Sequence, residues 1–323
     1  MDTIITTHIT DNHRLDTHPD RAATATRRAT LARRSLLVGG LGLAGAGALG
    51  TSSRAAGPSS PNARHARIAA LEEKYGTTIG FRAVNLRTGR VMRHRDTLRL
   101  ALCSTFKPFA VAALLRDHDR DGEVLAASVP VRAEESVANS PIFDTRIGGT
   151  MTYAEFCDAA LRYSDNASAN MILRRIGGPS AVTGFARSIG DRHTRLDRWE
   201  TELNSSLPHD LRDTSTAAAL ATSYTRLLLG DVLTTDDRKR LLGWMLRNQT
   251  AGKVFGAGIP GGWPLADKTG GGEHGSRNEV GITWTPDGSP IVMAALTRVG
   301  MAGATGPDAC LADLARLATG ELA

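Results

Sequence analysis

Residues 101–110 read ALCSTFKPFA, which places Ser104 three positions before Lys107 at the start of an apolar segment. Serine is a common first residue of helices and Pro108 suits a first helical turn, so one interpretation of Ser104 is a helix cap. The other is a nucleophile, because residues three apart share a helix face and the Lys107 amine can reach the Ser104 hydroxyl. A serine hydroxyl needs such a neighbouring base. This stretch alone leaves both interpretations open.

Strands are expected near both ends of the chain that follows the N-terminal leader. TIGFRAVNLRTGRVMRHR, residues 78–95, predicts a hairpin, and a second is predicted where EVGITWT and IVMAALTR flank the turn PDGSP at 286–290. Apolar periodicity predicts helices in the following segments: 63–75, 105–116, 153–162, 166–175, 214–229 and 310–318.

This order of elements predicts an α+β fold, with an antiparallel sheet formed from both chain ends, flanking helices and an inserted all-helical lobe. We place the α/β lobe at residues 57–94 plus 250–323 and the helical lobe at 95–249. The active site is expected in the cleft between the two lobes, where ligand sites commonly form.

The composition predicts a globular protein, since 41% of the 323 residues are hydrophobic and can form a sizeable core. The formal net charge is +6, but residues 1–56 hold seven Arg against four Asp, about half of that excess. The remaining charge is too small to predict a nucleic-acid partner.

The first 56 residues are interpreted as an export signal and spacer. Arg33 and Arg34 directly precede a weakly apolar run, residues 36–50, that is too short and glycine-rich to span a bilayer. This pattern is similar to a twin-arginine signal, although Arg27 and Arg28 form a second candidate pair. The expected protein is therefore exported, secreted or held in the periplasm or cell envelope, without stable membrane association after signal removal.

Three cysteines, Cys103, Cys157 and Cys310, give an odd number without a close pair, so no structural disulfide is expected. The histidines show no metal-ligand spacing, which predicts no metal and no cofactor. We expect a monomer that acts on a small molecule.

Two further motifs decide between the interpretations of Ser104. YSDNASAN carries Ser164, Asp165 and Asn166 before a predicted helix, and ADKTGGGEHGSRNEVGI carries Lys268, Thr269 and a glycine run. Either motif alone is typical of a polar turn. Together, Ser-x-x-Lys, Ser-Asp-Asn and Lys-Thr-Gly occur in this order, about 60 and 100 residues apart. The set resembles the active-site serine penicillin-recognising family.

The segment RLDRWETELNSSLPHDLRD, residues 195–213, indicates the branch of that family. It places Glu200 and Asn204 four positions apart, bounded by Arg198 and Asp213, and it resembles the omega loop of class A β-lactamases. Glu202 has no partner at the matching offset. The resemblance covers roughly residues 60–320.

The resemblance implies a role for each matching residue. Ser104 would attack the lactam carbonyl, with Lys107 or Glu200 as the base, and Ser164 would protonate the leaving nitrogen. Backbone N–H groups of Ser104 and Gly271 would hold the oxyanion. Glu200 and Asn204 would activate the hydrolytic water. The residues that would contact the substrate are Asn166, for the acylamino chain, and Lys268, Thr269 and Arg277, for the carboxylate.

The expected function is hydrolysis of penicillins and some cephalosporins. A penicillin-binding DD-peptidase or a non-hydrolysing β-lactam-binding protein would share Ser-x-x-Lys and Lys-Thr-Gly, but Glu200 argues against both. The chain departs from the family at Asn139, where many members have an aromatic residue.

Overall fold

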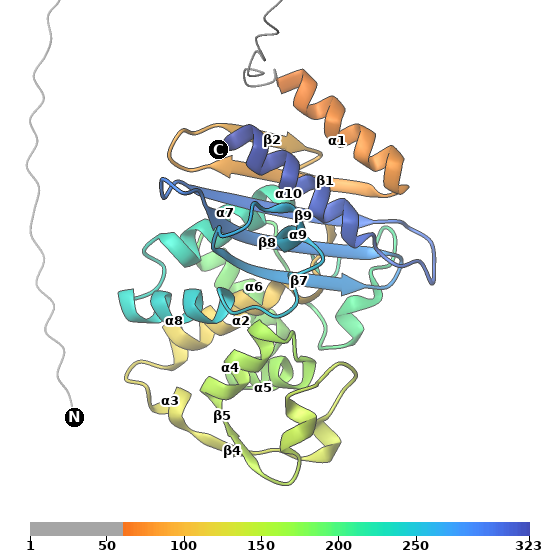
Figure 1. Cartoon of the computed structure of the whole chain (residues 1–323). Coiled ribbons are helices and arrows are strands. Elements are labelled where there is room, and N and C mark those ends of the chain that lie inside the picture. Colours follow the sequence, from red (N-terminus) through yellow and green to blue (C-terminus); the bar gives the residue numbers. More distant parts are fainter. Residues whose placement is uncertain (1–60) are drawn as a thin grey trace, which may run out of the picture. The chain divides into compact units, whose positions relative to one another are not determined.

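The computed structural model describes residues 61–323, so the predicted export signal and its arginine pairs lie outside the described residues. Five antiparallel strands form the main sheet in the order β2-β1-β9-β8-β7 (Figure 1). Their bounds are Thr78–Asn85 for β1, Val91–His94 for β2, Leu265–Gly272 for β7, Ser276–Trp284 for β8 and Pro290–Arg298 for β9. The sheet thus joins both ends of the described chain, which confirms the predicted fold class.

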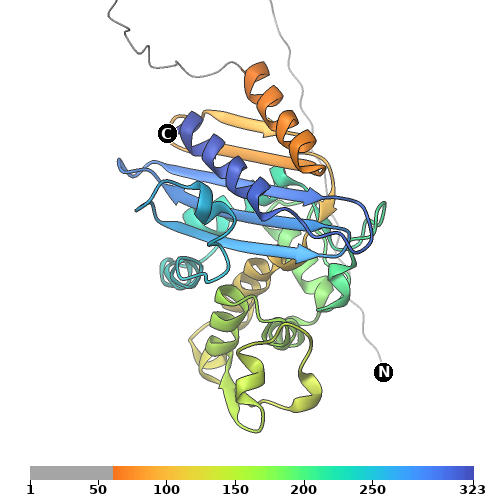
Figure 2. The ribbon, with the colours of Figure 1, turned by 45° about the vertical axis from the view of Figure 1, so that its right-hand side comes forward.

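Alternate residues of the central strand β9 are buried in two different hydrophobic clusters. Ile291, Met293 and Ala295 pack with residues of the helices that cover one face of the sheet. Val292, Ala294 and Leu296 belong to the larger cluster on the opposite face. Successive side chains of a strand point to opposite faces, so a strand covered on both sides is apolar at every position. The covering helices are α1 (Pro61–Tyr75), α9 (Phe255–Gly258) and α10 (Asp308–Leu322) (Figure 2).

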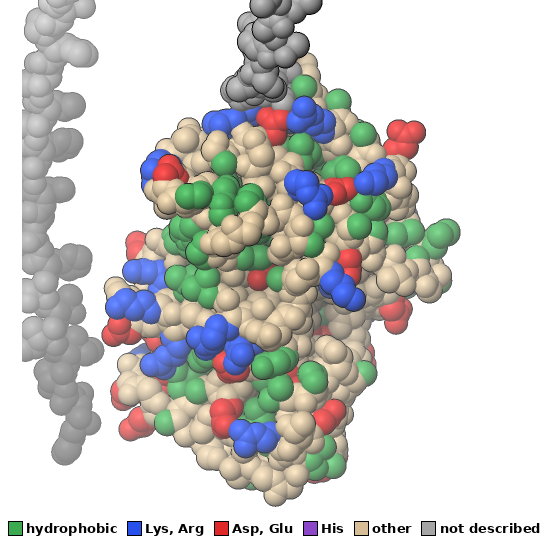
Figure 3. All heavy atoms as spheres, viewed as in Figure 1, with side chains coloured by type: hydrophobic (Ala, Val, Ile, Leu, Met, Phe, Trp, Pro, Cys, Tyr) green, Lys and Arg blue, Asp and Glu red, His purple; other side chains and the backbone are tan. Residues whose placement is uncertain are grey.

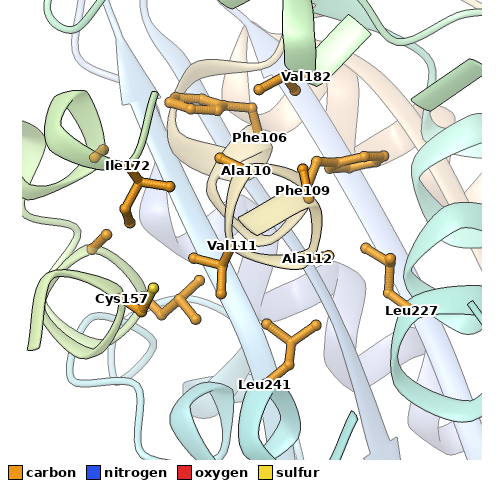
Figure 4. Packing of buried hydrophobic residues seen from close by; sticks show 14 of the residues in the cluster. Phe106, Phe109, Ala110, Val111, Ala112, Cys157, Ile172, Val182, Leu227 and Leu241 are labelled. Atoms are coloured by element: carbon orange, nitrogen blue, oxygen red, sulfur yellow. The ribbon is translucent and has the colours of Figure 1, made fainter. Parts of the chain in front are cut away.

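The other helices lie on the opposite side of the sheet. They are α2 (Lys107–Ala113), α3 (Glu123–Ala126), α4 (Tyr153–Arg162), α5 (Asn166–Ile176), α6 (Pro179–Ser188), α7 (Ala217–Leu229) and α8 (Thr235–Met245). Helix α2 is at their centre, where Phe109 and Val111 are packed among side chains of its neighbours (Figure 4). Every residue of α2 is buried. A helix that is buried all round holds its first residue, Lys107, rigidly.

The middle of the chain also contains short strands between its helices. β3 (Leu100–Ala101) pairs with β6 (Thr214–Ser215), and β4 (Ser128–Pro130) pairs with β5 (Thr150–Thr152). The β3–β6 pair joins the segment before Ser104 to the end of the omega loop, residues 195–213. A further hydrogen bond, from Leu102 N–H to Asp213 O at 2.8 Å, extends this contact. This pairing places two distant segments of the predicted site side by side.

The surface of residues 61–323 carries charges of both signs. On the face in Figure 3, basic and acidic side chains are interspersed. Within this range, no helix has the length and hydropathy needed to cross a membrane, and no three His, Cys, Asp or Glu side chains are grouped as metal ligands would be. Cys103, Cys157 and Cys310 are free and buried.

Candidate active site

Ser104 lies in a 3₁₀ helix, Cys103–Phe106, that leads directly into α2. Its hydroxyl does not cap either helix; instead Oγ donates to Glu200 Oε1 at 3.3 Å. Cys103 has a left-handed backbone, with φ of 46°. On the other side of Ser104, a Cβ placed on Gly270 would lie 3.3 Å from the Ser104 N atom. The nucleophile candidate is therefore held between strand β7 and the omega loop.

Lys107 is buried and makes hydrogen bonds to three residues. Its Nζ lies 2.7 Å from Ser164 O, 2.7 Å from Asn166 Oδ1 and 3.1 Å from Glu200 Oε1. Burial lowers the pKa of this amine, against the opposing effect of the Glu200 carboxylate. Lys107 thus reaches Ser104 through the Glu200 oxygen that both contact. The predicted proximity of Ser104 and Lys107 takes this bridged form.

Glu200 is fixed by its backbone as well as by its side chain. Asn170 of α5 accepts from Glu200 N–H at 3.1 Å and donates to Glu200 O at 2.8 Å. Asn204 Nδ2 donates to Glu200 Oε2 at 2.6 Å, while Asn204 Oδ1 is a buried acceptor without a partner among residues 61–323. The sequence interpretation missed Asn170. Its position four residues after Asn166, on the same face of a predicted helix, was the available signal.

The neck of the omega loop is closed by an ion pair. Arg198 Nε donates to Asp213 Oδ2 at 2.6 Å, and Asp213 Oδ1 accepts the backbone N–H groups of Asp197 and Arg198 at 2.7 and 3.0 Å. The Asp213 side chain is fully buried, and these donors are hydrogen-bonded to both of its carboxylate oxygens. Breaking a buried pair by removing one partner costs about 3–5 kcal/mol. This pair fixes the loop that carries Glu200.

Ser164 connects the two buried lysines. Its Oγ lies 3.0 Å from Lys268 Nζ and 3.4 Å from Lys107 Nζ, and its backbone is left-handed with φ of 58°. Burial, together with the smaller effect of the nearby Lys107 charge, lowers the pKa of Lys268 to about 7. A continuous series of polar contacts therefore runs from Ser104 through Glu200, Lys107 and Ser164 to Lys268.

The remaining predicted residues lie along or beside strand β7. Thr269 Oγ1 hydrogen-bonds Thr250 Oγ1 at 2.6 Å, and Gly271 is exposed at the outer edge strand of the sheet. Arg277 pairs with Asp308 at 2.5 Å and donates to Gly270 O at 3.3 Å. Its guanidinium is thus held beside β7, with one acidic partner at the start of α10.

Asn166 contacts the protein through both atoms of its amide. Oδ1 accepts from Lys107, and Nδ2 donates to Ala138 O at 2.9 Å. Asn139 has a left-handed backbone with φ of 62°, and its carbonyl accepts from Asn166 N–H at 3.1 Å. Asn166 is therefore fixed by its neighbours and also orients the Lys107 amine.

The chain is similar to known β-lactamases in sequence and in fold. The model of the β-lactamase enzyme family matches residues 63–322. A curated β-lactamase from Streptomyces cellulosae is 47% identical over 83% of this chain and 89% of its own length, and β-lactamase FAR-1 from Nocardia farcinica is 44% identical over 78% and 80%. The solved β-lactamase from Streptomyces albus G has a TM-score of 0.80 and 40% identity, covering 81% of this chain and 100% of its own. The chain belongs to the class A serine β-lactamase family.

Proposed function

We propose that this enzyme hydrolyses the β-lactam amide of penicillins, and of some cephalosporins, through an acyl-enzyme on Ser104. The observation that carries the proposal is the contact of one Glu200 carboxylate with both the Ser104 hydroxyl, at 3.3 Å, and the Lys107 amine, at 3.1 Å. A serine next to a buried base is the arrangement needed for nucleophilic catalysis. Relatives that bear the name β-lactamase support the same assignment.

Acylation begins when Ser104 Oγ attacks the lactam carbonyl. We assign its proton to Glu200, because this is the carboxylate to which the hydroxyl already donates. The Lys107 amine stabilises that carboxylate and is the alternative base. Backbone N–H groups of Ser104 and Gly271 then stabilise the oxyanion, and losing one such donor typically costs about 2.7–4 kcal/mol.

The C–N bond of the lactam breaks as its nitrogen takes a proton from Ser164. Lys107, which lies 3.4 Å from Ser164 Oγ and 3.1 Å from Glu200 Oε1, replaces the proton on Ser164 and takes up the one that Glu200 received from Ser104, so Glu200 is again a carboxylate before deacylation. Lys268, in its cationic form, Thr269 and Arg277 bind the substrate carboxylate, a task suited to charged and hydroxyl donors. Asn166 contacts the acylamino group while it orients Lys107.

Deacylation uses a water molecule between Glu200 and Asn204. The unpartnered Asn204 Oδ1 accepts one hydrogen of this water, and the Glu200 carboxylate removes the other as the oxygen attacks the ester. When the tetrahedral intermediate collapses, Ser104 Oγ recovers a proton and the penicilloate is released. The amide of Asn204 orients Glu200 throughout.

The test combines turnover with intact-mass spectra of the purified mature chain. The wild type should hydrolyse benzylpenicillin and a chromogenic cephalosporin without accumulating an adduct. Glu200→Ala should acquire one adduct slowly and retain it, and Ser104→Ala should acquire none. Full turnover by Glu200→Ala would overturn the assignment. A persistent adduct on the wild type would indicate a non-hydrolysing binding protein instead.

The proposal extends to where and in what form the enzyme works. We infer export by the twin-arginine route from Arg33 and Arg34, and activity as a secreted or cell-envelope monomer that contributes to antibiotic resistance. Changing both arginines to lysine should leave the protein inside the cell. Unchanged export would assign the signal to Arg27 and Arg28 or to another export route. The monomer is tested separately by size-exclusion chromatography, where elution of the mature chain as a dimer would contradict it.

A further inference from the structure

Asn278 is fully buried on strand β8, and both ends of its side-chain amide are hydrogen-bonded to backbone. Its Nδ2 donates to Ala101 O at 2.8 Å and to Leu102 O at 3.2 Å, and its Oδ1 accepts from Thr297 N–H at 3.0 Å. A carbonyl oxygen only accepts and a backbone N–H only donates, so these partners fix which end of the amide faces which segment. The side chain therefore connects strand β9 with the segment that precedes Ser104.

The segment that Asn278 holds turns directly into the candidate nucleophile. Leu102 is followed by Cys103, whose φ of 46° lies in the left-handed region, and then by Ser104. A residue other than glycine persists in this conformation only where the surrounding structure fixes the backbone. Leu102 N–H donates to Asp213 O at 2.8 Å, and Leu102 O accepts from Asn278. The backbone is thus held on both sides immediately before the turn.

Strand β7 lies against the same segment. Gly270 of β7 is paired with Asn278 of β8, and a Cβ on this glycine would lie 3.1 Å from Leu102 O and 3.3 Å from Ser104 N. The next residue of β7, Gly271, carries the second N–H of the proposed oxyanion hole. Asn278 is therefore joined to the segments of both donors, to β7 by strand pairing and to the residues before Ser104 by its amide.

We propose that Asn278 is a positioning residue that sets the distance between the two oxyanion donors, the N–H groups of Ser104 and Gly271. Such donors act at about 2.7–3.1 Å from the oxyanion. A misplacement of about 1 Å, caused by a substitution away from the reacting atoms, can cost ~100-fold in rate. Without the Asn278 amide, the carbonyls of residues 101 and 102 lose a donor and the segment before Ser104 moves relative to β7. This inference rests on the proposed function, in which these two N–H groups stabilise the oxyanion.

The experiment compares Asn278→Leu with a matched control, Asn85→Leu. Asn85 is also a buried asparagine with three hydrogen bonds to backbone: its Nδ2 donates to Leu322 O at 2.8 Å, and its Oδ1 accepts from the N–H groups of Arg87 and Thr88. These contacts are at the end of β1 and do not involve the segment before Ser104. Both substitutions should lower Tm, since each removes a similar set of buried hydrogen bonds.

Two further measurements separate positioning from stability. One is kcat/KM for benzylpenicillin. The other is the infrared stretching frequency of the ester carbonyl in the acyl-enzyme, recorded in the Glu200→Ala background, where the adduct persists. Hydrogen bonds from the oxyanion hole weaken the C=O bond and lower this frequency, so it reports on the two donors directly.

Asn278→Leu should lower kcat/KM at least ~tenfold and raise the carbonyl frequency, because the displaced donors bind the oxygen less strongly. Asn85→Leu should remain within ~twofold of the wild type, with an unchanged frequency. Wild-type activity in Asn278→Leu, a loss of activity without a change in frequency, or equal changes in the two variants would each overturn the proposal.

Asn278→Asp takes the place of Asn278→Leu if the latter does not fold. Aspartate keeps the size of asparagine but offers one donor when protonated and none when ionised, where asparagine has two. It should lower kcat/KM at least ~threefold and raise the carbonyl frequency, and wild-type values of both would overturn the proposal. If the wild type hydrolyses benzylpenicillin and the Asn278 variants are unaffected, only this inference fails. If the wild type hydrolyses no β-lactam, the proposed function fails and the inference with it.

Discussion

Strand β7 places two buried charges of opposite sign in adjacent positions, and they face different environments. Lys268 contacts Ser164 in the active site, whereas Asp267 accepts from Asn248 Nδ2 at 2.6 Å and hydrogen-bonds Glu279 behind the sheet. Burial lowers the pKa of Lys268 to about 7 and raises that of Asp267 to about 6. The same physical effect therefore favours the neutral form of both groups.

Lys268 and Asp267 differ in the groups that surround them. Lys268 belongs to a series of groups that can exchange protons and reach a substrate, while Asp267 and Glu279 form an enclosed acidic pair. Burial and the Asp267 charge raise the pKa of Glu279 well above its usual range, so the pair holds a proton. Alternation along one strand thus separates a group proposed for function from an acidic pair that is enclosed on the other face of the sheet.

The largest expected effect is a difference in catalytic activity between substitutions on the two faces of β7. Lys268→Met should lower kcat/KM for benzylpenicillin by ~100-fold, because hydrogen bonds to charged groups contribute up to about 3 kcal/mol. Asp267→Asn is the matched control on the other face and should remain within ~threefold of the wild type. Equal losses in the two variants would show that the distinction between the faces is wrong. Steady-state kinetics at one pH is sufficient.

The second prediction concerns the pH dependence of the same lysine. Lys268 binds the substrate carboxylate as a cation, so kcat/KM should fall as pH rises through its pKa of about 7. The value at pH 8 should be about tenfold below that at pH 6. Lys268→Arg keeps its charge throughout this range and should abolish the decline. A decline with the same midpoint in that variant would assign it to another group, such as Lys107.

The third prediction tests the acidic pair through stability. An acid whose pKa is raised on folding weakens the fold as pH increases, beginning near its ordinary pKa. For Asp267 this loss runs from pH 3.8 to about 6, and Glu279 extends it upward. Glu279→Gln preserves the shape of the protonated acid and should flatten the fall in the free energy of unfolding between pH 5 and 6.5. The free energy of unfolding is measured by urea denaturation at each pH. If it falls equally with pH in the wild type and in Glu279→Gln, Asp267 and Glu279 do not share a proton.

The last prediction is that a reducing agent has no effect on thermal stability. Reducing agent should leave Tm unchanged, because the three cysteines are free and buried. Burial also raises the pKa of Cys103 to about 12, which disfavours the reactive thiolate. A clear fall in Tm with dithiothreitol, observed by calorimetry, would show a pairing that the structure does not contain.

Much of the fold was predictable from local patterns. Both hairpins and the helices near 153–162 and 166–175 occur where the sequence predicted them, because turn residues and apolar periodicity are local signals. The helix predicted at 105–116 is divided into a 3₁₀ segment, α2 and a π segment. Its division depends on packing at Ser104 and at the centre of the helices, which periodicity does not report.

The site was predictable only as a set of residues. Chemical type and order along the chain selected Ser104, Lys107, Ser164, Glu200 and Lys268. They did not show that Asn166 orients Lys107, or that Asn170 holds the Glu200 backbone. Those roles depend on hydrogen-bond partners, and side-chain amides are common in loops and helices for many reasons.

The linear sequence was sufficient to identify the family, because the side chains that its reaction requires occur in a recognisable order along the chain. Only the tertiary structure decided which atoms meet: Ser104 with Glu200 across 96 residues, and Ser164 with Lys268 across 104. Contacts at such separation are set by the packing of the 3₁₀ helix Cys103–Phe106 against β7 and β8 and by the β3–β6 pair that anchors the omega loop. The same packing excludes water from the lysines and lowers their pKa values, an effect that no local pattern encodes.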